Sequence, residues 1–172
     1  MSKITRHIWC TTYAALVKWR SRSQWFLPAG KAREFFTRRV CAEVGERIAV
    51  ERNPTFSSKV HMDSYARIGC TCELKGGLHS DDRISMAPEV AFRIANHEYG
   101  RLDVPMNVQG GASTSPVCVG SDVRPGRREI VMLCAHIGDG HMIMTGAVAC
   151  KDVPAFSIAG APARVIGSRR EV

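Results

Sequence analysis

Residues 117–150 read VCVGSDVRPGRREIVMLCAHIGDGHMIMTGAVAC, and this stretch decides the fold because inward-type residues return in it every six positions. The same period runs upstream from Val50 to Phe92. An α-helix repeats every 3.6 residues and a strand every 2, so a sustained period of six indicates one short strand and one turn per repeat. The pattern therefore predicts an all-β solenoid, a parallel β-helix. Its repeat positions are Val50, Phe56, Met62, Ile68, Leu74, Ser80, Met86, Phe92, Val119, Pro125, Val131, Ile137, Ile143 and Ala149.

A second set of positions, two residues before the first set, is also mostly apolar. Two inward residues spaced two apart suit a short strand that lines a narrow interior, because alternate strand residues face the same side. We expect three six-residue repeats to make one coil. The companion positions are Ile48, Pro54, Val60, Ala66, Cys72, Leu78, Ile84 and Val90.

The repeat divides the chain into three expected segments. Residues 1–47 form an N-terminal helical, basic segment, residues 48–154 form the β-helix, and residues 155–172 form a C-terminal tail. Between about 96 and 116 the period is lost in a stretch rich in glycine, proline and polar residues. A loop of this length inside a compact repeat is usually functional, so we expect an extruded functional loop here.

The N-terminal segment is expected to contain two helices, over 11–27 and 32–41, with Pro28 and Gly30 ending the first. Up to Arg47 it carries ten lysines and arginines against three glutamates, which is most of the formal charge of +8. Such a segment suits an anionic lipid surface, nucleic acid, a phosphorylated ligand or simple solvation. The sequence of this segment does not distinguish among these ligands. We keep association with a membrane surface as one expectation and expect no nucleic acid partner.

Composition excludes several classes of protein. The chain of 172 residues has no stretch near the ~20 apolar residues that span a bilayer. Its N-terminus lacks a signal-peptide core, so we expect a cytoplasmic protein. The seven cysteines are odd in number and contain no CxxC pair. This usage argues against a disulfide framework and a tetrathiolate zinc site, and we expect no metal.

Several motifs resemble those of the hexapeptide-repeat acetyltransferases. In the closing coils these are Val119-Gly-Ser-Asp-Val, Ile137-Gly-Asp-Gly and Gly146-Ala-Val-Ala-Cys-Lys-Asp-Val-Pro. Upstream, Ala95-Asn-His-Glu-Tyr, Val104-Pro-Met and Gln109-Gly resemble the loop of sugar O-acetyltransferases of exopolysaccharide and capsule biosynthesis. The resemblance spans about residues 45 to 168 and extends to the maltose and galactoside acetyltransferases.

The resemblance implies a left-handed β-helix, a homotrimer and an active site between subunits. The implied activity is acetyl transfer from acetyl-CoA, as cosubstrate, to a hydroxyl of a sugar or glycan. His97 matches the catalytic histidine of the family and would act as the general base, which contributes roughly 10²–10⁴ in rate. Asn96, Glu98, Met106 and Gln109 would bind the acceptor. Glu98 or Asp103 would orient the imidazole ring.

By the same resemblance, coenzyme A would lie beside the last coils. Thr145, Gly146 and Ala147 would contact its pantetheine arm through backbone groups. The phosphates or the adenine would meet cationic side chains, which favour phosphate oxygens. These side chains are Lys151, Arg164 and Arg169.

Several residues depart from the family pattern, among them Arg124, Pro125, Glu129 and Cys150. Arg124 and Pro125 stand where relatives carry Trp-Ile, and Cys150 replaces a threonine. Glu129 falls at an inward position, and burial of an unpaired carboxylate is costly. We therefore expect Glu129 to be paired, protonated or on a distorted strand. Further departures occur at Met144-Thr145 and in the turn before Ile137, and with Cys150 we expect them to lie along the coenzyme wall, which leaves weak CoA binding open.

Two other functions remain open. The first is a noncatalytic or CoA-binding-impaired trimeric scaffold, which a collapsed groove around residues 124–134 would favour. The second is a zinc-dependent hydratase of the γ-carbonic-anhydrase type, with His136 and His141 as ligands and His79 or His97 as the third. The repeat argues against zinc, because His136 should point outward and His141 inward.

Overall fold

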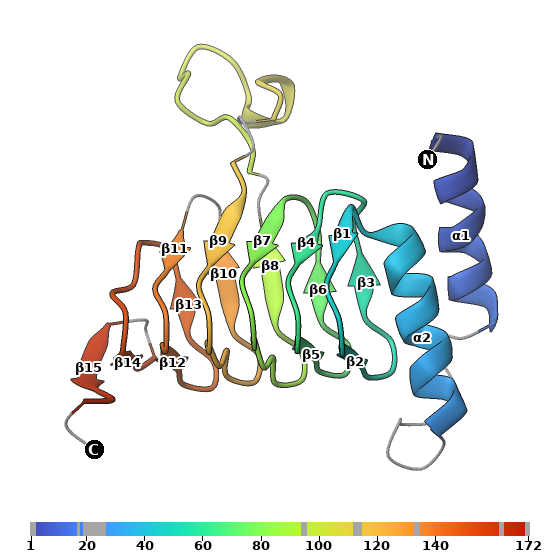
Figure 1. The fold of residues 1–172 in the computed structure, drawn as a ribbon. Helices are drawn as coiled ribbons and strands as arrows, with labels where there is room; N and C mark the ends of the chain where they lie inside the picture. The colour runs from blue at the N-terminus through green and yellow to red at the C-terminus, as the bar shows by residue number, and fades with distance from the viewer. Residues whose placement is uncertain are drawn as a thin grey trace.

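The computed structural model describes residues 3–16, 18, 27–93, 96–111, 115–132, 135–161 and 164–170. Two helices precede a left-handed parallel β-helix, and a long loop projects from one edge of the solenoid (Figure 1). The helices cover the N-terminal end of the coils, and the last strand lies at the opposite end. The predicted fold class is confirmed.

Each coil adds one strand to each of three sheets. Successive coils pair in parallel 18 residues apart, as Glu43 pairs with His61 and Thr55 with Glu73, so three repeats make one coil. The first sheet contains β1 (Glu43–Val44), β4 (His61–Met62), β7 (Leu78–Ser80), β9 (Val117–Val119) and β11 (His136–Ile137). The third sheet contains β3 (Thr55–Phe56), β6 (Glu73–Leu74), β8 (Ala91–Arg93), β10 (Ile130–Met132) and β13 (Val148–Ala149).

The second sheet is assembled from shorter pieces. Single bridges from Arg67 to Ser85 and from Arg124 to Met142 continue it through the middle coils. Its last coil is two residues shorter than the others, since Met142 pairs with Ile158. Its strands are β2 (Ala49–Val50), β5 (Arg67–Ile68), β12 (Met142–Ile143), β14 (Ser157–Ala159) and the antiparallel β15 (Val165–Ser168).

The interior of the prism holds the residues that the six-residue period selects. All the repeat and companion positions are buried except Phe56, which is half-buried. The coils thus bury one continuous apolar core from Ile48 to Ala159. Its apolar area supplies the main favourable term for folding, at roughly 25 cal/mol per Å².

The three sheets meet at three corners. The first corner joins the first sheet to the second, and the second corner joins the second sheet to the third. Both turn through residues with positive φ, a conformation that costs most L-residues about 1–2 kcal/mol. These residues include Arg47, Tyr65, Arg83, Asp122 and Gly140 at the first corner, and Asn53, Thr71, Glu89, Arg128 and Gly146 at the second. The third corner returns the chain to the first sheet and carries the loop.

The helices differ from the expected boundaries. They are α1 (Lys3–Leu16) and α2 (Leu27–Val40), and residues 19–26 lie outside the described part of the chain. Pro28 and Gly30, expected to end a helix, lie instead in the first turn of α2. Proline is tolerated there because that turn has no use for its missing N–H.

The two helices form a cap over the first coil. Trp9 packs edge-on against Phe35 and Phe36, with ring centroids 5.8 and 5.7 Å apart, and Tyr13 lies 6.0 Å from Phe56 of the coil. Arg33 is fully buried, and its Nε donates to the carbonyl of Val50 at 2.9 Å. Neither helix is long and apolar enough, over its described residues, to cross a membrane.

The solenoid itself is longer than expected at both ends. Its first strand begins at Glu43 rather than near residue 48, and β14 continues the coil beyond residue 154. The loop joins β8 to β9 and contains the short helix η1 (Met106–Val108).

Candidate functional site

The neck of the extruded loop holds His97. His97 bridges Gly111 in antiparallel fashion, and Glu98 N–H donates to the carbonyl of Gly110 at 3.1 Å. The N–H of His97 also donates to Asn96 Oδ1 at 2.9 Å, so the Asn96 side chain binds the backbone of the loop. This pairing fixes the His97 backbone and leaves its side chain exposed.

Gln109 and Arg101 hold the loop together from within. Gln109 Nε2 donates to the carbonyls of Arg101 and Val104 at 2.8 and 3.0 Å, and its Oε1 accepts from Arg101 N–H at 3.1 Å. Hydrogen bonds from the Arg101 guanidinium hold the pKa of the Asp103 carboxyl below its usual range. Within the described loop neither Asp103 nor Glu98 bonds to the His97 ring. The carboxylates expected to orient that ring do not do so in this chain alone.

Beyond its neck the loop exposes apolar side chains. Leu102 exposes 98% of its surface and Met106 exposes 66%, and Tyr99 and Val108 are similarly open. Exposed apolar groups that gather on a projecting loop suit contact with a ligand or another subunit. The assignment of Met106 to acceptor binding stays a prediction.

The residues predicted to contact pantetheine lie at the second corner. Thr145 and Gly146 are exposed there, and Gly146 has a φ of +79°. Ala147 is fully buried; its N–H donates to Met144 O, and its carbonyl accepts from Ile130 N–H. The backbone groups of Ala147 therefore bond within the solenoid, whereas Thr145 is exposed and accessible to a ligand.

The three predicted phosphate contacts lie in different places. Lys151 is exposed at the third corner, and Arg164 is exposed just before β15. Arg169 Nη1 donates to the Gly140 carbonyl at 2.7 Å and to Asp122 Oδ2 at 3.0 Å. Arg169 thereby ties the C-terminal strand to the first corner.

These positions do not form one groove in a single chain. His97 and Lys151 belong to the third corner, whereas Thr145 and Gly146 belong to the second, and the third sheet separates the two corners. A site that combines them needs a second copy of the chain.

Arg124, Pro125, Glu129 and Cys150, which depart from the family pattern, lie at different places on the coils. Arg124 points outward from the second sheet, Pro125 is buried, and Cys150 is exposed at the third corner. They share no wall. The coil is not collapsed around them, because β10 keeps its parallel pairing with both β8 and β13.

Glu129 lies in the core without exposed surface. Its Oε2 accepts from Gly126 N–H at 2.9 Å, and its Oε1 has no hydrogen-bond partner. Burial raises the pKa of Glu129 to about 8, so the carboxyl is mainly protonated at neutral pH. Protonation is one of the three arrangements that the sequence left open.

His141 is the second buried ionisable group of the coils. Its Nδ1 lies 2.8 Å from Ser157 Oγ, and burial lowers its pKa to about 4. His136 instead lies outside on the first sheet, as the repeat predicts. The two imidazoles cannot share a metal ion. The described residues contain no group of three or more His, Cys, Asp or Glu side chains that fits one.

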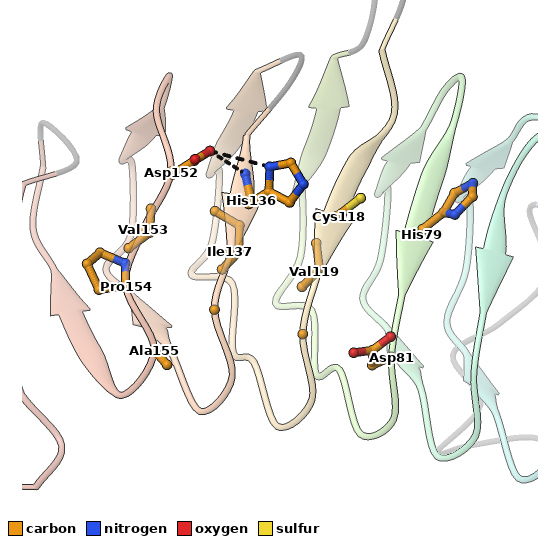
Figure 2. Close-up of a pocket in the computed structure, with 12 residues that line it drawn as sticks. His79, Asp81, Cys118, Val119, His136, Ile137, Asp152, Val153, Pro154 and Ala155 are labelled. Atoms are coloured by element: carbon orange, nitrogen blue, oxygen red, sulfur yellow. Dashed lines mark hydrogen bonds and ion pairs between the residues drawn. The ribbon is translucent and has the colours of Figure 1, made fainter.

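A shallow hollow of about 670 Å³ lies on the outer face of the first sheet, and its importance was not evident from the motifs. Figure 2 shows His79, Cys118 and His136 on successive strands, with Asp152 beside His136. His136 N–H donates to Asp152 Oδ1 at 2.9 Å, and the ring Nδ1 lies 3.6 Å from the same oxygen. The 18-residue spacing of outward positions links Cys118 to His136, but the intervening loop hides the alignment of His79 with Cys118. Its open imidazole and carboxylate groups can hydrogen-bond a polar ligand.

Comparison with known proteins identifies clear relatives, although no protein-family model matches the chain. Galactoside O-acetyltransferase of Escherichia coli K12 is 28% identical over 139 residues, which cover 78% of this chain and 67% of the relative. The structure of a maltose O-acetyltransferase from Clostridium difficile 630 superimposes with a TM-score of 0.78 at 24% identity, over 96% of this chain and 87% of that one. Galactoside acetyltransferase in complex with coenzyme A gives 0.75 at 21% identity, over 98% and 84%.

The structural matches establish a shared fold, and the curated relative extends the likeness to sequence along most of the chain. The six-residue repeat agrees with this shared fold. The chain thus resembles the hexapeptide-repeat acetyltransferases in fold and, at 28% identity to one of them, in sequence along most of its length.

Proposed function

We propose that the protein transfers an acetyl group from acetyl-CoA to a hydroxyl of a sugar or glycan, as in polysaccharide biosynthesis. The observation that supports this proposal most strongly is the sequence similarity to galactoside O-acetyltransferase over 139 residues, which include most of the solenoid. Coenzyme A as the donor is supported by its presence in the complex of galactoside acetyltransferase.

His97 is the proposed general base. An exposed imidazole on a fixed backbone can accept the proton of the acceptor hydroxyl as its oxygen attacks the thioester carbonyl carbon. A backbone N–H of a neighbouring coil would stabilise the tetrahedral oxyanion. The C–S bond then breaks, and the imidazolium returns its proton to the leaving thiolate. The sequence of steps balances without a metal.

A homotrimer would supply the rest of the site. Since Thr145 and Gly146 lie at a different corner from His97, a groove between two copies can bring the loop of one against the last coils of the other. Arg164 and Lys151 keep exposed cations available for phosphates in such a groove. One observation favours the scaffold alternative: the backbone N–H and carbonyl of Ala147 already form hydrogen bonds within the solenoid and are not free for the coenzyme.

The test is an acetyl-transfer assay with acetyl-CoA and a panel that includes galactosides and maltose. His97→Ala should lower kcat by roughly 10²–10⁴, because only proton transfer is lost. His7→Ala, at an exposed position on α1, is the matched control and should retain activity. Undiminished turnover by His97→Ala would refute the base assignment.

Calorimetry with coenzyme A separates enzyme from scaffold. The wild type should bind, and Arg164→Ala should bind more weakly because a phosphate contact is lost. A wild-type protein without measurable binding would instead support the noncatalytic scaffold.

A further inference from the structure

A groove of about 510 Å³ crosses the outer face of the second sheet and the adjoining second corner. Arg67, Ser85 and Arg124 form part of its floor, and Arg52, Thr71 and Arg127 stand along the corner. In Figure 1 the second-sheet strands β2, β5 and β12 run along the edge opposite the projecting loop. The groove is therefore separate from His97 in the same chain.

The arginines of this groove differ from most others in the protein. Elsewhere, arginine side chains bind carboxylates, as Arg93 binds Glu73, or stack on rings, as Arg47 stacks on Tyr65. Among the arginine side chains that the structure describes, five have no hydrogen bond, ion pair or ring contact. Three of the five line this groove. The five are Arg52, Arg67, Arg83, Arg124 and Arg164.

The carboxylates near the groove are already engaged. Glu89 accepts from Arg127 Nη2 at 2.7 Å and also binds Arg128, and these bonds lower the pKa of the Glu89 carboxyl. Glu51 lies close enough to Arg33 for its charge to oppose the lowering of the Arg33 pKa that burial causes. Glu51 and Glu89 line the same surface, but Arg52, Arg67 and Arg124 share it without an ion pair of their own, and like charges held together repel one another.

Strand register sets the spacing of the two central arginines. Arg67 bridges Ser85, and Ser85 N–H donates to the carbonyl of Val123, next to Arg124, at 2.9 Å. Arg67 and Arg124 therefore stand two strands apart, roughly 9–10 Å between backbones. Both side chains point outward, with the small Ser85 side chain between them. The guanidinium groups of Arg67 and Arg124 can therefore approach a ligand above Ser85 from opposite sides.

We propose that this groove binds the pyrophosphate group of a small molecule. Guanidinium groups bind phosphate oxygens bidentately, and a pyrophosphate offers one phosphate to Arg67 and the other to Arg124. Arg52 adds a third charge at the corner, and the Ser85 and Thr71 hydroxyls can donate to the remaining oxygens. The proposal does not depend on the role of His97.

The direct test is calorimetry of the full-length protein with inorganic pyrophosphate at low and high salt. The wild type should bind, with affinity falling as ionic strength rises. Arg67→Gln and Arg124→Gln should each weaken binding about tenfold or more, since each removes charge-assisted hydrogen bonds. Arg83→Gln is the matched control, because Arg83 is exposed and unpaired but lies at the first corner outside the groove. It should bind as the wild type does.

Competition identifies the source of the pyrophosphate. Coenzyme A and uridine diphosphate both carry this group, and the natural type of ligand is the one that displaces pyrophosphate from the wild type and itself binds Arg67→Gln more weakly than the wild type. Displacement by neither would overturn the assignment to a pyrophosphate-bearing metabolite.

Equal affinity of the arginine variants and the wild type for pyrophosphate would overturn the assignment as well. So would dissociation of an oligomer by Arg67→Gln or Arg124→Gln with no pyrophosphate bound, which would place these arginines in an interface. Acetyl transfer by the same variants is scored separately, so failure here leaves the proposed activity testable.

Discussion

Glu129 and His141 lie inside the coils with no exposed surface, and each leaves one polar atom without a hydrogen-bond partner. Burial disfavours the charged form of both, so the pKa of the acid rises to about 8 and that of the imidazole falls to about 4. Both side chains are mainly neutral near pH 7. Two polar groups are thus accommodated in an apolar core through their protonation states.

This pair predicts a loss of stability above pH 6.5. The folded pKa of Glu129 exceeds its unfolded value near 4.5, so its contribution is complete below pH 4.5 and is lost as the pH rises towards 8. The folded pKa of His141 lies below its unfolded value near 6.5, so its contribution grows from pH 4 and is complete above 6.5. Between pH 6.5 and 8 the Glu129 effect dominates, because the unfolded imidazole of residue 141 is already half deprotonated at pH 6.5. The free energy of unfolding should fall by about 1 kcal/mol over that interval, since Glu129 is half ionised at pH 8 and the remaining His141 effect opposes the fall.

Urea denaturation at pH 6.5 and pH 8 checks this expectation. Glu129→Gln removes the titrating group and should abolish most of the fall, whereas Glu98→Gln, at an exposed loop position, should keep it. A fall that persists unchanged in Glu129→Gln would show that another group causes it.

At the scale of elements, the two corners with positive φ repeat in every full coil, and most of their residues are not glycine. Gly140 and Gly146 form a natural pair for measuring what a corner tolerates. A Cβ at Gly140, where φ is +60°, would lie 2.6 Å from Phe156 Cδ1, whereas one at Gly146 would meet nothing within 4 Å. The first site adds a steric clash to the backbone strain that both share.

Gly146→Ala should therefore cost about 1 kcal/mol of unfolding free energy, from backbone strain alone. Gly140→Ala should cost at least about 1 kcal/mol more, because the Phe156 ring must move as well. Denaturant midpoints of the two variants, measured side by side, check the difference. Equal midpoints would mean that the ring moves aside freely.

The strands were predictable because each inward position repeats the same environment, so one period specifies the whole solenoid. The helix ends were not, since Pro28 serves equally as a stop signal and as a first-turn residue. His97 could be singled out only by resemblance, and its exposed side chain at the loop neck agrees with that choice. The groove arginines could not be found in this way, because whether an arginine lacks a partner depends on the coils above and below it.

At the scale of the whole molecule, the two ends of the solenoid are covered to different extents. α1 and α2 close the N-terminal end with an aromatic cluster, and β15 pairs antiparallel with β14 at the other. Covered ends prevent the open strand edges from pairing with further chains. We therefore expect copies of the chain to associate through the sides of the prism.

Apolar side chains around the second corner of the last coils are the expected surface for such association. Met142, Met144 and Val148 expose 41%, 48% and 40% of their surfaces there. Their proximity to Thr145 and Gly146 would place an interface beside the proposed coenzyme contacts.

We expect the wild-type protein to be a trimer by light scattering coupled to size-exclusion chromatography. Met144→Lys and Val148→Lys should shift the trimer to smaller species, because each buries a charge in the interface. Ile4→Lys, at a 75% exposed position on α1, should leave the trimer intact. A monomeric wild type at micromolar concentration would contradict both the interface and a shared active site.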